Sequence, residues 1–322
     1  MRAFATAMLF AGMLGAQAPP AAPPQPAEVA IIVTPATPNA FLMARSGKVV
    51  GAVCDDKKLR IWSLPDNKPL HEIDFVGRRM DVVVMSDDGG WIAGGDHNGV
   101  YSLWNAATGA EQMHLELSFY PSAIAFSPDG KRLAIAPVGE PVQIYDPASG
   151  KKLFELQRMI GGTNAVVFSR DRELIATADA DTGVRVYDGR SGAMLDHNTD
   201  FLLEAFTAAF TPDGKQLLAA GADKVIDVLD IATGYVIHKS AKAAGPIGNL
   251  DISADGTLLV AALFNADNPA TAEPVVISET ATGKQVQEWD PPVPPIGGGW
   301  TTDGHLLAGT ASNTALHVWR VR

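Results

Sequence analysis

The chain of 322 residues is 47% hydrophobic and 19% charged, which suits a globular protein with a large core and argues against general disorder. Its 25 basic and 36 acidic residues give a formal net charge of −11, and the basic residues are not clustered, which disfavours nucleic acid as a partner. The single cysteine, Cys54, excludes an internal disulfide and a cysteine-based zinc cluster. Because it ends an apolar run, we expect it to be a buried core residue.

The N-terminal segment has the pattern of a secretory signal peptide. Arg2 precedes an uncharged stretch over 3–15, and Ala16-Gln17-Ala18 follows with the small residues that signal peptidase prefers. We therefore predict a signal peptide over 1–18 and a periplasmic or secreted protein. The uncharged stretch is short for a membrane span, so an uncleaved anchor is the weaker alternative and no transmembrane segment is expected after cleavage. The proline-rich segment 19–27 is predicted to be a stiff linker.

From residue 28 onward one pattern recurs. An apolar strand ends in a turn such as Ser127-Pro128-Asp129-Gly130, a second strand follows, a third ends in an aromatic residue, and a Thr-Gly or Ser-Gly turn comes next. The last residues of the first turn are Gly47, Gly89, Gly130, Arg172, Gly214, Gly256 and Gly304. The corresponding third strands end at Trp62, Trp104, Tyr145, Tyr187, Leu229, Ser278 and Trp319. A period near 42 residues with four short strands per copy predicts a propeller blade, and seven copies are visible.

This pattern resembles the WD40-repeat β-propeller family, as a divergent, secreted bacterial-type member. The resemblance covers residues 28–322 and implies an all-β, seven-bladed propeller with four-stranded antiparallel blades. The Gly-His pair of the family is missing, and its Trp-Asp pair survives only in altered form, as in Tyr187-Asp188. The family's turn aspartate, which helps to hold a hydrogen-bonded network, is matched by Asp56, Asp181 and Asp223.

The ends of the repeat predict how the ring closes. The last copy stops directly after its third strand, and the apolar run 29–33 precedes the first copy without a place in it. We therefore expect this run to complete the seventh blade as its outer strand, because the edge of the last third strand would otherwise stay uncovered.

No catalytic, nucleotide-binding or metal-binding motif accompanies the repeat. The seven histidines lack ligand spacing, and the segment 179–183 resembles a calcium loop only faintly. We therefore expect no cofactor and no enzymatic activity. The alternative is a binder of small ligands at the channel mouth or a propeller enzyme, lactonase-like or quinoprotein-like. At that mouth the repeat places a mixed, mostly neutral set, namely Asn39, Asp81, Ser122, Asn164, Phe206, Gly248 and Ile296.

The sixth copy is longer than the others and is the best indication of a contact surface. Its additional residues fall at 264–273 and 290–295, in two connections that emerge on the same face of a propeller. The predicted partner-binding residues there are Phe264, Asn265, Asp267, Trp289, Asp290 and Trp300. For both tryptophans the alternative is ordinary packing between blades. Arg78 and Arg79 lie in the corresponding connection before the second copy and can hold an acidic group of a partner.

Together these features predict a monomeric, non-enzymatic scaffold that binds another protein outside the cytoplasm, with its contact surface on the face of the sixth-copy insertions.

Overall fold

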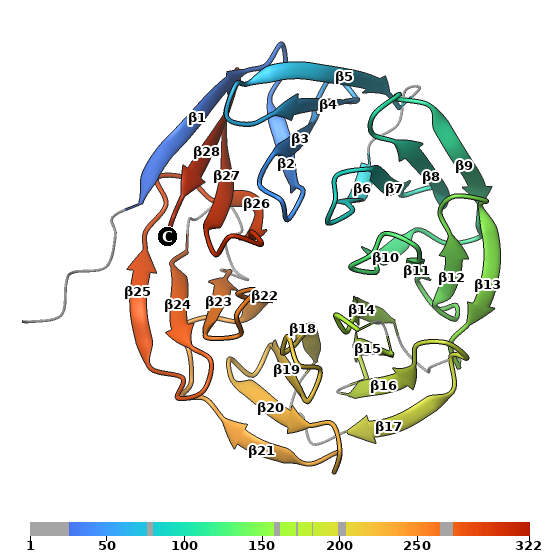
Figure 1. The fold of residues 1–322 in the computed structure, drawn as a ribbon, viewed down its shortest axis with the longest axis vertical. Helices are drawn as coiled ribbons and strands as arrows, with labels where there is room; N and C mark the ends of the chain where they lie inside the picture. The colour runs from blue at the N-terminus through green and yellow to red at the C-terminus, as the bar shows by residue number, and fades with distance from the viewer. Residues whose placement is uncertain are drawn as a thin grey trace, which may run out of the picture.

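The computed structural model describes residues 26–75, 80–157, 162–171, 173–181, 183–198, 204–264 and 273–322. The described residues form β-strands and turns, and the strands assemble into seven four-stranded antiparallel sheets. Figure 1 shows these sheets arranged as blades around a central opening, with the first strand of each repeat innermost. The prediction of an all-β, seven-bladed propeller is confirmed.

Each of the first six blades uses four consecutive strands. Blade one contains β2 (Pro38–Met43), β3 (Val49–Cys54), β4 (Lys58–Ser63) and β5 (Lys68–Asp74). Blade two contains β6 (Met80–Met85), β7 (Trp91–Asp96), β8 (Val100–Asn105) and β9 (Glu111–Glu116). Blade three contains β10 (Pro121–Phe126), β11 (Leu133–Pro137), β12 (Gln143–Asp146) and β13 (Lys151–Glu155).

The next three blades follow the same order. Blade four contains β14 (Thr163–Phe168), β15 (Leu174–Asp179), β16 (Val184–Asp188) and β17 (Met194–Asn198). Blade five contains β18 (Ala205–Phe210), β19 (Gln216–Gly221), β20 (Ile226–Asp230) and β21 (Val236–Lys239). Blade six contains β22 (Ile247–Ile252), β23 (Leu258–Leu263), β24 (Val275–Glu279) and β25 (Gln285–Trp289).

Blade seven combines both ends of the described chain. Its strands are β26 (Pro295–Trp300), β27 (Leu306–Ser312), β28 (Ala315–Arg320) and β1 (Ala27–Val33). The outer strand β1 pairs antiparallel with β28, with Ile32 opposite Leu316, and Figure 1 shows the two strands side by side. The N-terminal strand therefore joins the blade made by the C-terminal segment, and the pairing holds the two ends together.

The core lies between neighbouring blades rather than within one sheet. One cluster joins Leu59 and Ile61 of blade one to Ile92 and Trp104 of blade two. Cys54 is buried, as its apolar run predicts, in the cluster that joins blades seven and one. Because each sheet buries both faces against its neighbours, the ring depends on every blade interface.

The first turn of the blade has the same hydrogen bonds in six copies. A serine or threonine hydroxyl donates to the aspartate two residues later at 2.5 to 2.7 Å. The same oxygen accepts a backbone N–H from the start of the next strand, as Ser127 does from Arg132 at 2.9 Å. Gly130 completes its turn with φ of 66°, a conformation that suits glycine best. This local chemistry explains why the turns were visible in the sequence.

The antiparallel order gives the disc two distinct faces. The turn face carries the turns between first and second strands and those between third and fourth strands. The connection face carries the turns between second and third strands and the links from one blade to the next. Within the described ranges, no helix has the length and hydrophobicity that a membrane span needs.

Candidate functional site

A β-bulge marks the channel mouth on the connection face. In every blade the register shifts at the second residue of the inner strand. These residues are Asn39, Asp81, Ser122, Asn164, Phe206, Gly248 and Ile296. They are the set that the repeat predicts at this mouth. Because a bulged residue leaves the regular ladder, its side chain can be re-aimed from the sheet.

Several polar groups at this mouth are already occupied by their neighbours. The Asn39 amide donates to Asp55 at 3.0 Å, and the Ser122 hydroxyl donates to the carbonyl oxygen of Ala136 at 2.9 Å. The Asn164 amide donates to Glu204 at 2.9 Å. The first two contacts lie within a single blade, and the third joins blade four to the residue before β18 of blade five. All three favour a structural role for these side chains.

An exposed aromatic group lies beside this mouth, on blades two and three. The His97 ring stacks on the Tyr120 ring with centroids 4.8 Å apart and planes 19° apart, and His97 Nδ1 lies 3.4 Å from an Asp81 carboxylate oxygen. Tyr120 is 40% exposed, and the adjacent Phe119 is 42% exposed. The buried Tyr101 hydroxyl donates to the Phe119 carbonyl oxygen at 2.9 Å and anchors the connection. We call Phe119, Tyr120 and His97 the aromatic cluster.

The predicted contact residues of blade six divide between surface and core. Phe264 is half-buried and packs against Phe206, with ring centroids 5.7 Å apart. Asp290 is exposed in the link to blade seven. Asn265 and Asp267 lie outside the described residues, as do Arg78 and Arg79. Phe264 and Asp290 thus remain candidates on the connection face.

The two tryptophans are core residues, which corrects the hypothesis that they contact a partner. Trp289 is 6% exposed and Trp300 is 0% exposed. Both belong to the cluster between blades six and seven, with Ile277 and Leu306. Since neither ring has surface to offer, packing between blades, the alternative interpretation, accounts for both.

The predicted turn aspartates hold arginines of the following strand in two blades. Both carboxylate oxygens of Asp56 accept from Arg60, at 3.0 and 2.5 Å, and this arginine lowers the pKa of Asp56. Asp181 holds Arg185 in the same way, at 2.9 and 2.6 Å. In blade five Asp223 accepts a backbone N–H, from Val225 at 3.2 Å.

Blade four extends this arrangement into a buried network that sequence reasoning missed. The buried Asp179 accepts from the hydroxyls of Thr163 and Thr177 at 2.8 Å each. It also accepts from Arg185 at 2.7 Å. The network ties the inner strand to the second and third strands. An arginine four residues after the turn aspartate was the available signal.

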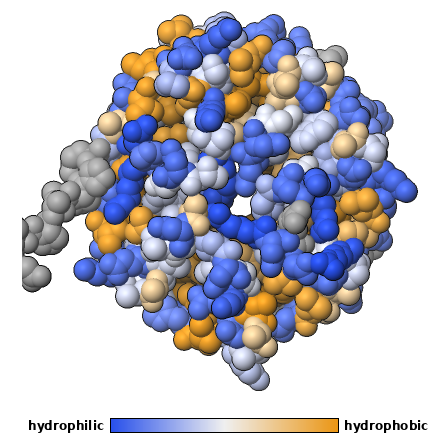
Figure 2. Space-filling view, in the orientation of Figure 1, coloured by the Kyte–Doolittle hydropathy of each residue, from blue (hydrophilic) through white to orange (hydrophobic). Residues whose placement is uncertain are grey.

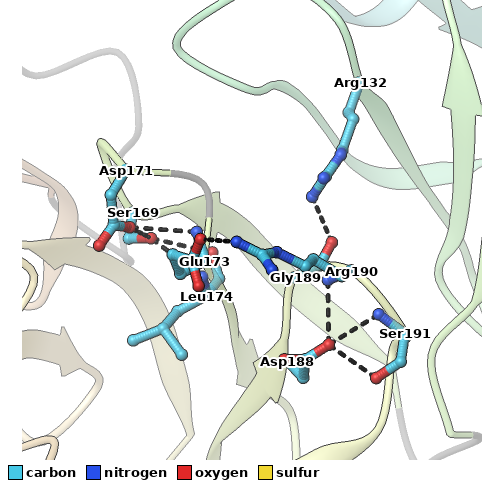
Figure 3. Close-up of polar contacts among 9 residues, drawn as sticks. All are labelled: Arg132, Ser169, Asp171, Glu173, Leu174, Asp188, Gly189, Arg190 and Ser191. Carbon is cyan, nitrogen blue, oxygen red and sulfur yellow. Dashed lines mark hydrogen bonds and ion pairs between the residues drawn. The ribbon is translucent and has the colours of Figure 1, made fainter.

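The turn face of blade four is fixed by a second polar group, shown in Figure 3. The Asp188 carboxylate accepts from the backbone N–H groups of Arg190 and Ser191 at 3.1 and 2.7 Å. Arg190 pairs with Glu173, and Arg132 of blade three donates to the Gly189 carbonyl oxygen. The last contact links neighbouring blades, so the group stabilises the ring.

The opposite mouth of the channel, on the turn face, holds an ion pair between distant blades. Arg45 of blade one donates to Asp251 of blade six at 2.6 Å. Its Nε lies 3.5 Å from an Asp87 carboxylate oxygen of blade two. Arg45 and Asp87 were not predicted as site residues, although three of the seven first turns carry a charged residue at their second position. Among the described residues, no group of three or more potential metal ligands is present.

Comparison with known proteins identifies one repeat. The family model for the WD domain, G-beta repeat, matches residues 155–188. This segment runs from the end of β13 to the end of β16. No curated protein matches the chain.

Proposed function

The chain is a WD40-repeat β-propeller, and we propose that it is a non-enzymatic scaffold that binds another protein on its connection face, outside the cytoplasm. This fold commonly mediates protein interactions. The proposal rests chiefly on the aromatic cluster, because Phe119 and Tyr120 are adjacent, exposed and held in place by a buried anchor. Rigid aromatic side chains give large contact area at small entropic cost.

The blade-six connections extend the proposed contact surface. Phe264 places a half-buried ring on the same face, and Asp290 adds an exposed charge. Val293, which follows in the same link, is 40% exposed. A surface that combines aromatic or aliphatic anchors with polar groups around them has the composition of a protein interface.

The proposed location follows from the leader-like segment 1–18. Its charge, apolar stretch and small residues are those of a secretory signal. The test is fractionation of the source cells followed by N-terminal sequencing of the mature chain. A chain that begins near Pro19 in the envelope fraction supports the proposal, whereas an intact N-terminus in the cytoplasmic fraction contradicts it.

Affinity capture from the envelope fraction tests the binding face. The double substitution Phe119→Ser with Tyr120→Ser removes the aromatic anchors. Tyr235→Ser is the matched control, since Tyr235 is 71% exposed in the link between the third and fourth strands of blade five. A partner retained by the wild type and by the control but lost by the double variant supports the connection face. Equal retention by all three proteins would exclude the aromatic cluster as the contact.

A further inference from the structure

The turn face has a ring of side chains set by the repeat itself. The second residue of the first turn is polar in four copies, where it is Arg45, Asp87, Arg170 or Thr302. These four residues line a cavity of about 650 Å³. Figure 2 shows an opening near the middle of the disc, edged by hydrophilic residues. A concave space with a few convergent polar groups is the usual form of a small-molecule site.

Two of the charged groups at this mouth satisfy each other. Asp251 accepts from Arg45 at 2.6 Å and from the Trp300 backbone N–H at 2.8 Å. Arg45 also donates to the Trp300 carbonyl oxygen at 3.3 Å. Because this pair is held at several points, it forms a fixed wall of the cavity rather than a group that awaits a ligand.

Asp87 is a carboxylate with spare capacity. Its contact among the described residues is Arg45 Nε at 3.5 Å, a long distance for a charge-assisted hydrogen bond. Burial raises the pKa of Asp87. A carboxylate accepts several hydrogen bonds, so Asp87 has room for a further donor from within the cavity.

Arg170 is the complementary cation. Within the described part of the chain its guanidinium makes no hydrogen bond and no ion pair, yet it lines the same cavity. Burial and the neighbouring charge of Arg45 lower the pKa of Arg170, against the opposing charges of Asp251 and Asp87. The planar guanidinium has the geometry to bind a carboxylate through two parallel hydrogen bonds.

The charges select the class of ligand. Arg45 and Arg170 offset Asp87 and Asp251, and Asp88 adds a further carboxylate, one of whose oxygens accepts from Ser86 and from the Gly90 backbone. A simple anion would therefore face an excess of carboxylates, and a simple cation would leave Arg170 unpaired. The wall between the charged groups includes Ala125, Val167 and Ala209, which suits a short hydrocarbon segment.

We propose that this mouth of the channel binds a small zwitterion, an amino acid whose carboxylate pairs with Arg170 and whose ammonium group pairs with Asp87. The site lies on the turn face and is independent of the proposed protein contact on the connection face.

Isothermal titration calorimetry with the mature full-length protein tests the proposal. The probes are glycine, β-alanine and γ-aminobutyrate, which carry both charges at increasing separation. Propionate and propylamine carry one charge each. We expect saturable binding of at least one amino acid and no saturable binding of the singly charged probes. Binding of propionate or propylamine as tight as that of the best amino acid would overturn the proposal, as would no saturation by any of the three amino acids at millimolar concentration.

Variants assign the two charges. Arg170→Gln and Asp87→Asn should each raise the dissociation constant of the tightest-binding amino acid at least tenfold, or by about 1.4 kcal/mol in binding free energy. Arg170→Lys should give an intermediate loss of affinity, because lysine keeps the positive charge but cannot form two parallel hydrogen bonds to a carboxylate. Arg190→Gln and Asp66→Asn are charge-matched controls outside the cavity and should bind as the wild type does. Circular dichroism verifies that each variant is folded, and wild-type affinity in the folded Arg170→Gln or Asp87→Asn variant would refute the assignment.

Discussion

Replacing Trp300 with alanine tests whether this side chain belongs to the core. Trp300 is fully buried between blades six and seven. Burying an aromatic side chain removes roughly 150–250 Å² from water, which at about 25 cal/mol per Å² corresponds to about 4–6 kcal/mol. Truncations of this kind in other cores cost about 3–5 kcal/mol. We expect Trp300→Ala to lower the free energy of unfolding by about 3–5 kcal/mol.

A comparison of phenylalanine variants refines this test. Among the described residues, the buried indole N–H of Trp300 has no acceptor, and a buried unpaired donor costs about 1–3 kcal/mol. Phenylalanine removes the donor, so Trp300→Phe should destabilise less than Trp289→Phe by a similar amount. Urea denaturation followed by far-ultraviolet circular dichroism measures both, without reliance on tryptophan fluorescence. A wild-type midpoint for Trp300→Ala would refute core burial, and an equal loss for both phenylalanine variants would refute the unpaired donor.

Three further predictions concern single groups. The hydrogen bond from Ser253 lowers the pKa of Asp255 below its ordinary value, so the contribution of this carboxylate to stability is present above that ordinary value and is lost as the pH falls through the folded pKa. The melting temperature of Asp255→Asn should therefore fall less on acidification than that of the wild type or of the exposed control Asp290→Asn, and equal slopes would contradict this. Burial raises the pKa of the Cys54 thiol, so Ellman's reagent should label Cys54 slowly in the folded protein and rapidly in urea; fast labelling of the folded protein would be inconsistent with burial. Thr163→Val should cost about 1–3 kcal/mol in urea denaturation because it removes a buried donor to Asp179, whereas Thr163→Ser keeps that donor and should cost less.

Local chemistry made the blades predictable from the sequence. The hydroxyl of Ser127, its aspartate partner and Gly130 lie within four residues, so the turn they form depends on little else in the chain. The predicted third strand 59–62 lies inside β4, and the predicted strand 184–187 lies inside β16. Because the repeat period and the turn type together determine where the strands lie, the number of repeats predicted the number of blades.

Contacts between blades limited the prediction of the site. Trp289 and Trp300 lie close to an irregular, proline-rich link. The sequence of such a link does not distinguish an exposed side chain from one that is buried against the neighbouring sheet. The exposed pair Phe119 and Tyr120 was overlooked because its link has ordinary length. An aromatic dipeptide between two blades was the available signal, and its exposure became visible only with the three-dimensional arrangement.

The pairing of Arg45 with Asp251 shows why the channel cluster required the closed ring. The two residues are 206 positions apart and meet because blade seven brings the ends of the chain together. Within six of the seven first turns, hydrogen bonds specify the hydroxyl and the aspartate, while the second residue varies from proline to arginine. The hydrogen bonds of the turn do not constrain this second position, although the ring directs it into a shared cavity. A charged residue can therefore stand there without disrupting the turn. Asp87 and Arg170 occupy that kind of position, so their charges need an explanation beyond the fold, and a ligand in the channel provides one.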